Sequence, residues 1–139
     1  MIRLDDSNPR VNVRLLRYLW AAPGSFLGLV IASFACRRGR ASVVDGVLEV
    51  HGPWLAWALC TCTPWCGGAV AMTFGHVVLA RDQATLDSTR IHERVHVRQY
   101  ERWGPAFIPA YLAASAWARL RGRHPYYDNP FEREAFAAE

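Results

Sequence analysis

The stretch "IHERVHVRQYERWG", from Ile91 to Gly104, places two histidines four residues apart, with a glutamate directly after the first. Residues four apart lie on one face of a helix, so His92 and His96 can point their imidazoles at one ion. Glu93 lies on the flank of that face, where it can reach a water beside the ion without being a ligand itself. The pattern is H-E-x-x-H, which predicts a Zn²⁺ site with Glu93 as its general base.

The residues around the motif favour a helix. Asp87 or Ser88 can cap its start, and Gly104-Pro105 can end it after Trp103. Gln99 and Trp103 continue the histidine face, where they can supply a hydrogen bond and a wall to the site.

An alternative interpretation of the same helix needs no metal. On a solvated helix Glu93 can pair with Arg90 or Arg94, and the two histidines are then ordinary polar residues. The complete H-E-x-x-H pattern, in a helix that follows a β-rich segment, favours the metal site.

A catalytic zinc usually has three protein ligands and one open position, so a third ligand has to come from another part of the chain. The remaining histidines do not stand in an H-x-x-G-x-x-H extension of the motif; they are His51, His76 and His124. The better source is the last expected helix, "NPFEREAFAAE", with Asn129 as cap and Pro130 at the first helical position. Glu132 of this helix can be a ligand, or it can bond back to the Asn129 amide in a capping box.

H-E-x-x-H on one helix, followed after an intervening helix by E-x-x-A on another, resembles the gluzincin group of zinc metallopeptidases. In that group the first glutamate of E-x-x-A-[DN] is the third ligand, which corresponds to Glu132 in "EREAF" of this chain. Phe136 stands where the group has Asp or Asn, and this departure makes Glu134 a rival ligand. The match covers Ile91 to Glu139.

The resemblance implies a small zinc-dependent hydrolase, a peptidase, that acts on a peptide or protein substrate. Its Zn²⁺ would be held by His92, His96 and Glu132, and Glu93 would deprotonate the water that attacks a peptide carbonyl. The resemblance also implies an edge strand that aligns the substrate, for which Ala71–Arg81 is the candidate.

The segment "HPYYDNP" precedes the last helix and offers further polar groups. Tyr126, Tyr127 or His124 can donate to the oxyanion that develops on an attacked carbonyl. Asp128 can hold a ligating histidine through its second ring nitrogen.

Upstream of the motif, the sequence predicts a small antiparallel sheet. Asp45-Gly46 is a strong hairpin signal, so Ser42–Val44 and Val47–His51 are expected to pair. Ala71–Arg81 is rich in β-formers and is expected to be a third strand. With a further helix over Ala106–Leu120, the expected fold is α+β, a sheet followed by three helices of which the first is the zincin-like H-E-x-x-H helix.

An uncharged run from Tyr18 to Cys36 is the candidate membrane helix of the chain. Arginines flank it on both sides, so the positive-inside rule gives no orientation, and Pro23-Gly24 interrupts its first third. A very apolar core helix is the alternative. We therefore divide the chain into an apolar segment over residues 1–40, a candidate membrane anchor, and a zincin-like domain over residues 41–139. Membrane association is favoured over a cytoplasmic location.

The composition bounds the remaining possibilities. A hydrophobic fraction of 52% and a charged fraction of 20% exclude a disordered polymer. The 16 basic residues are all arginine and form no long basic stripe, so no nucleic-acid partner is expected. The cysteines lack the paired C-x2-C spacing of a structural zinc site, and buried free thiols are favoured; they are Cys36, Cys60, Cys62 and Cys66.

Two other functions compete with the hydrolase. One is a non-catalytic zinc-binding structural protein, in which the metal braces the helices and no base is needed. The other is a membrane-associated interaction protein without metal. Glu93→Gln would leave the first of these functional, whereas the second would contain no stoichiometric zinc.

Overall fold

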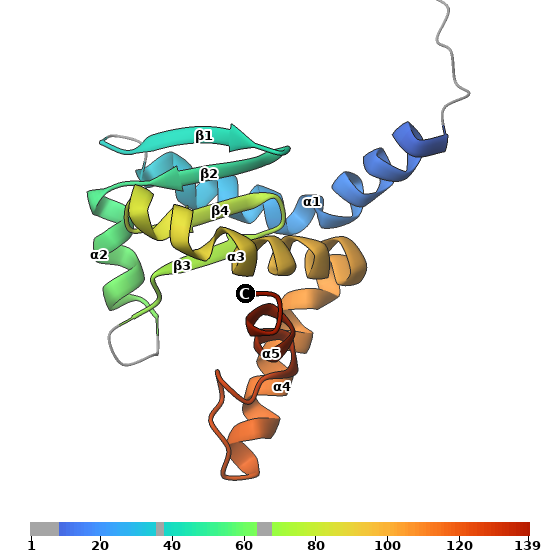
Figure 1. Ribbon diagram of the computed structural model, residues 1–139, viewed down its shortest axis with the longest axis vertical. Helices are drawn as coiled ribbons and strands as arrows, with labels where there is room; N and C mark the ends of the chain where they lie inside the picture. Colours follow the sequence, from blue (N-terminus) through green and yellow to red (C-terminus); the bar gives the residue numbers. More distant parts are fainter. Residues whose placement is uncertain (1–8, 36–37, 64–67) are drawn as a thin grey trace, which may run out of the picture.

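The residues that the structure describes, 9–35, 38–63 and 68–139 of a computed structural model, form a four-stranded sheet with helices on both faces (Figure 1). In chain order the elements are α1 (Pro9–Ala35), β1 (Arg40–Val44), β2 (Val47–His51), α2 (Pro53–Thr61), β3 (Ala71–Phe74), β4 (Val77–Ala80), α3 (Gln83–Trp103), the 3-10 helix η1 (Gly104–Ala106), α4 (Phe107–Leu120) and α5 (Pro130–Phe136). The expected α+β class is confirmed.

The sheet is mixed, with the strand order β1-β2-β4-β3. β1 pairs with β2 and β3 pairs with β4 in antiparallel ladders, but β2 and β4 are parallel. The expectation of a purely antiparallel sheet is therefore wrong for the central pair. Parallel neighbours cannot be joined by a tight turn, and here α2 and β3 lie between the two strands in the chain.

The segment Ala71–Arg81, expected as one strand, folds as two. Phe74 pairs with Val77, so Gly75 and His76 form a two-residue turn between β3 and β4, and Gly75 has a φ of 59°. A side chain at residue 75 would also collide with α1, so both the turn and the packing require glycine here. As a result, β3 is an edge strand of the sheet.

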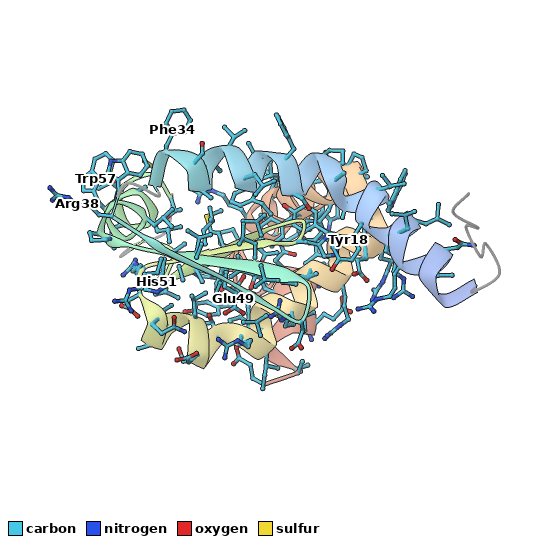
Figure 2. All side chains as sticks on the ribbon, turned by 90° about the horizontal axis from the view of Figure 1, so that it is seen from above. Tyr18, Phe34, Arg38, Glu49, His51 and Trp57 are labelled. Atoms are coloured by element: carbon cyan, nitrogen blue, oxygen red, sulfur yellow. The ribbon has the colours of Figure 1, made fainter. Side chains whose placement is uncertain are left out.

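The central strand β4 is buried on both of its faces. Successive side chains point to opposite sides of a strand, so Leu79 packs with Ala32 of α1 and Leu55 of α2, whereas Val78 packs with Leu86 of α3. Figures 1 and 2 agree that α1 runs along one face of the sheet and α3 along the other. The molecule thus has three layers, and α3 carries the H-E-x-x-H motif on the layer opposite α1.

α1 packs against the sheet through small residues. A Cβ atom at Gly24 would lie 2.7 Å from the Tyr100 ring, and one at Gly28 would lie 2.7 Å from the Cβ of Val77. The segment 1–40, which the sequence separates from the rest, therefore shares a core with the sheet over its described part. By length and composition, Asn12–Phe34 of α1 (23 residues, mean hydropathy 1.4) could cross a membrane, and 22% of an 18-residue window within it is buried.

α3 begins before the expected cap at Asp87 or Ser88. Asp82, two residues after the end of β4, has an extended backbone, and its Oδ1 accepts a 2.7 Å hydrogen bond from the Thr85 amide. The helix ends at Trp103 as expected, and Gly104 follows with a φ of 54°.

Candidate metal centre

Three buried side chains meet where α3 and α5 pack together: His92, His96 and Glu132. Nε2 of His92 lies 3.0 Å from Oε2 of Glu132 and 3.2 Å from Nε2 of His96. Nε2 of His96 lies 3.4 Å from Oε1 of Glu132. Because two imidazole nitrogens and a carboxylate converge from two helices, this group could hold a metal ion.

Asn129 fixes the end of α5 that carries Glu132. Its Oδ1 caps the helix by accepting from the Phe131 amide, as the sequence predicted for this position. Its Nδ2 donates to the Tyr111 carbonyl and the Ser115 hydroxyl group of α4, and the residue is 0% exposed. The side chain of Glu132 points toward the two histidines, so the capping-box alternative for this glutamate is wrong.

The second ring nitrogen of each histidine has an oxygen partner. Nδ1 of His96 lies 2.8 Å from Oε1 of Gln99, the residue for which the sequence predicted a hydrogen bond to the site. Nδ1 of His92 lies 2.9 Å from Oε1 of Glu139. The sequence assigned such a role to Asp128, which is wrong, because Asp128 accepts from a backbone amide of its own loop. Partners of this kind fix the orientation of a ligating imidazole.

Glu93 is buried beside the group and is not one of the three converging side chains. It is 5% exposed, and its Oε2 accepts a 2.6 Å hydrogen bond from the hydroxyl group of Thr73 on β3. Burial raises the pKa of Glu93 above its ordinary value of 4.5. A carboxylate with a raised pKa is a stronger base, which suits a residue that accepts protons.

The arginines of α3 do not neutralise Glu93. Arg90 and Arg94 both bind Glu49 of β2, with N–O distances of 3.0 Å, and Glu49 is 2% exposed. The alternative in which Glu93 pairs with Arg90 or Arg94 on a solvated helix is therefore wrong. It fails because α3 packs on the sheet, so the two arginines point toward β2 and Glu93 points toward β3.

Tyr111 of α4 completes the surroundings of Glu132 by donating a 2.6 Å hydrogen bond to its Oε1. Burial alone would raise the pKa of Glu132, but hydrogen bonds with His92, His96 and Tyr111 lower it to about 2. Burial would likewise lower the pKa of the two histidines, and their hydrogen bonds to Glu132 raise it instead. Glu132 is therefore ionised at neutral pH, which is the state that a metal ligand needs.

The three side chains are close enough together to share one ion. Ligands about 2.0–2.1 Å from Zn²⁺ in a tetrahedral arrangement lie about 3.3 Å from one another. The two imidazole nitrogens lie 3.2 Å apart, and each is near a different oxygen of Glu132: His92 lies 3.0 Å from Oε2 and His96 lies 3.4 Å from Oε1. The same set of two nitrogens and one carboxylate also accepts other divalent ions of the first transition row. The residues present therefore fit a bound divalent metal.

Glu134, the rival ligand, lies on another side of α5. Its Oε2 accepts from Nε2 of Gln99 at 3.0 Å, and its Oε1 lies 3.2 Å from Arg102. Hydrogen bonding from Gln99 lowers the pKa of Glu134. Glu134 therefore contacts Gln99, which itself contacts His96, and does not join the three converging side chains.

A cavity of about 700 Å³ opens beside the group. Glu93, His92, His96 and Glu132 line it together with β3 residues and apolar side chains of α4. The loop residues that the sequence proposed as oxyanion donors also line the cavity: His124, Tyr126 and Tyr127. Trp103, expected as a wall, does not line it, because this residue packs on Phe131 at the far end of α3.

Three contacts to this site were not expected from the sequence. They come from Thr73, Tyr111 and Glu139. The sequence offers one indication for Tyr111, a phenol in a mainly apolar helix, and none for Thr73 or Glu139. Among the cysteines, Cys60 and Cys62 are exposed free thiols, so the expected burial is wrong for both, and Cys36 and Cys66 lie outside the described residues.

No match to a known protein tests the gluzincin resemblance. That resemblance rests on Ile91 to Glu139 alone, and the strongest support for a metal site is the geometry of the three side chains. Comparisons with protein-family models, with curated proteins and with solved structures give no match to this chain.

Proposed function

We propose that the protein is a zinc-dependent hydrolase, a small peptidase of gluzincin type, in which His92, His96 and Glu132 hold the metal and Glu93 is the general base. The observation that carries the proposal is the burial of Glu93 beside the three converging side chains, within the same cavity. A purely structural zinc site is closed, so it needs neither a separate buried carboxylate nor a cavity beside it.

The metal would contribute Lewis acidity when bound, since Zn²⁺ polarises a carbonyl oxygen and lowers the pKa of water. Glu93 accepts the proton of the attacking water and passes it to the leaving amine. Its raised pKa supports both roles, because the group has to be protonated and deprotonated in turn near neutral pH. Thr73 orients the carboxylate by donating to Oε2, which leaves the other oxygen for the water.

Tyr126 is the candidate donor to the developing oxyanion. It lines the cavity, and burial, the negative charge of Glu132 and a hydrogen bond to that carboxylate raise its pKa, so the phenol stays protonated and can donate. Tyr111 donates to Glu132 at 2.6 Å, which places it to hold the carboxylate.

The strand β3 is the candidate for aligning a peptide substrate. It is at the edge of the sheet, and every residue from Gly68 to Phe74 lines the cavity. An extended peptide can bind to an edge strand through main-chain hydrogen bonds. Apolar residues of α4 that line the cavity, among them Phe107, Ile108 and Leu112, favour a substrate with an apolar side chain at the cleavage site.

The test is to measure bound zinc and peptide cleavage in the wild type, Glu93→Gln and Glu134→Gln. We expect one zinc per chain in all three, and a loss of activity of at least about a thousandfold in Glu93→Gln only. Glu134→Gln is the matched control, because it removes a nearby carboxylate that is outside the group of three. If Glu93→Gln keeps full cleavage activity, or if zinc-loaded wild type cleaves no peptide of a diverse library, the peptidase proposal is wrong.

A further inference from the structure

The face of α1 that points away from the sheet consists of large apolar residues. Its inner side is made of small residues such as Ala21, Gly24 and Gly28, which are buried. A surface helix of a soluble protein has the opposite arrangement, with its large apolar residues turned to the core and polar residues outside. We call the outward set, with exposed fractions from 38% to 70%, the outer face of α1: Leu16, Leu19, Phe26, Val30 and Phe34.

Tryptophans of α2 extend this apolar surface. α1 and α2 share the core cluster of Ala32 and Leu55, and Figures 1 and 2 place α2 beside the end of α1 that carries Phe34. Trp54 and Trp57 of α2 are 49% and 58% exposed. An exposed apolar surface on α1, without charged residues from Tyr18 to Phe34, marks a site of interaction with a partner or a membrane.

The charges at the two ends of α1 favour an anionic membrane as the occupant. Arg14 precedes the uncharged run, Arg38 and Arg40 follow it, and all three are exposed. Arg17, which also precedes the run, pairs with Glu101 of α3 at 3.6 Å. Guanidinium groups at this position can bind lipid phosphates. A second copy of the chain packed on the same face, in either direction, would bring arginines against arginines, and this repulsion disfavours a dimer.

The packing of α1 decides its orientation in the membrane. Tyr18 donates to the Gly46 carbonyl of the β1–β2 turn, and further along the helix Gly24 and Gly28 contact α3 and the sheet. If α1 spanned the bilayer, the sheet packed along it would lie at the same depth, including the edge strand β1, most of whose residues are exposed. Open sheet edges do not occur in the hydrocarbon region, because their backbone groups would have no partners there.

We propose that α1 lies in the plane of the membrane, with its outer face and Trp54 and Trp57 inserted into an anionic lipid surface and the arginines at its two ends on the headgroups. The helix is then an interfacial element, and the bilayer covers the layer of the molecule opposite α3. This proposal does not depend on the hydrolase, because none of the residues that line the metal-site cavity belongs to α1 or α2.

The test is flotation of the purified full chain with preformed vesicles. Vesicles of phosphatidylcholine and phosphatidylglycerol are compared with vesicles of phosphatidylcholine alone. We expect binding to the anionic vesicles that weakens as salt is raised, and a decrease of at least about tenfold in the double variant Phe26→Ser, Phe34→Ser. Phe26 and Phe34 are 70% and 69% exposed, so this variant should keep the fold, which its melting temperature checks.

Trp117→Ser is the matched control. Trp117 is 58% exposed, like Trp57, but belongs to α4, which extends away from α1 in Figure 1. Its substitution should leave flotation unchanged. Protease added outside the vesicles should digest the whole bound chain, since an interfacial helix sends nothing into the lumen.

Three outcomes would overturn the proposal. The first is no flotation of the wild type, or equal flotation of the wild type and the double variant. The second is a fragment protected inside the vesicles, which would show that α1 spans the membrane. The third is a dimer in lipid-free solution that the double variant abolishes while no vesicle binding occurs, which would assign the outer face to a second copy of the chain.

Discussion

The hydroxyl group of Tyr111 lies 2.6 Å from Oε1 of Glu132, so a tyrosine of α4 holds the carboxylate that α5 contributes to the candidate metal centre. Side chains of α3, α4 and α5 therefore meet at this carboxylate, since the two histidines of α3 contact it as well. Removing this hydroxyl group should loosen the ligand without removing it. We expect Tyr111→Phe to weaken zinc binding by about 10- to 100-fold, as measured by competition with a chromophoric chelator. An unchanged affinity would mean that Tyr111 does not position the ligand.

The identity of the third ligand can be tested by comparing two glutamates of α5. We expect Glu132→Ala to lose stoichiometric zinc, because it removes one of the three converging groups and leaves two buried imidazoles. Glu134→Ala should keep zinc, because its carboxylate contacts Gln99 and Arg102 instead. Metal analysis of both purified variants gives the result. Zinc kept in Glu132→Ala and lost in Glu134→Ala would show that Glu134 is the third ligand.

Zinc should stabilise the protein against heat. A ligand that binds only the folded chain adds about 4 kcal/mol at a thousandfold excess over its dissociation constant. We therefore expect the melting temperature to fall on chelation and to recover when zinc is added back. His96→Ala should melt at one temperature with or without zinc, which separates loss of this site from general effects of the chelator.

Asp82 gives a pH dependence that is independent of the metal. The hydrogen bond from the Thr85 amide lowers the pKa of Asp82 below its ordinary value of 3.8. A lowered pKa means that the carboxylate stabilises the folded state above pH 3.8, and that this contribution is lost as the pH falls through the folded-state pKa. We expect Asp82→Ala to melt at a lower temperature than the wild type at pH 7, with a difference that shrinks in acid.

Asp82→Asn is the control for this experiment, because it keeps an oxygen acceptor at the helix cap but has no carboxylate to titrate. It should melt between the wild type and Asp82→Ala at pH 7. A difference between wild type and Asp82→Ala that stays constant into acid would contradict the assignment.

Gly28 tests the close packing of α1 on the sheet. Helix propensity alone predicts that Gly28→Ala stabilises the protein by about 1 kcal/mol. The structure predicts the opposite sign, because the new Cβ would lie 2.7 Å from the Cβ of Val77 and 2.9 Å from that of Phe74. We expect a decrease in the free energy of unfolding of about 1–3 kcal/mol, measured with denaturant. Ser33→Ala on the exposed side of α1 should change it by less than about 0.5 kcal/mol.

The parts of the site that follow from local periodicity could be predicted from the sequence. The i, i+4 spacing brought His92 and His96 together, and the cap at Asn129 set the start of α5. Helical geometry also separates Glu132 from Glu134, since residues two apart do not face the same side. The local pattern could not specify which side chains of other helices and strands contact each residue of the site.

Contacts between elements account for what the sequence did not predict. Thr73 and Glu93 are 20 residues apart in the sequence, and His92 and Glu139 are 47 residues apart. Neither contact is therefore visible as a periodic pattern in the sequence. The segment Ala71–Arg81 is different, because Gly75 is a turn signal within it, although the β-formers on both sides of Gly75 predict one strand. The parallel pairing of β2 with β4 depended on that missed turn.

The inner side of α1 has a consequence for how the chain is synthesised and folds. Ala21 and Gly24 contact Gly75 and Tyr100, which lie more than fifty positions later in the chain. During translation, α1 therefore leaves the ribosome well before the residues that cover its small side have been made. Its outer face needs no such residues, because lipid can cover it at once. A bilayer close to the ribosome would then act as the first folding partner of this helix, and the sheet and α3 would assemble on a helix that is already in place.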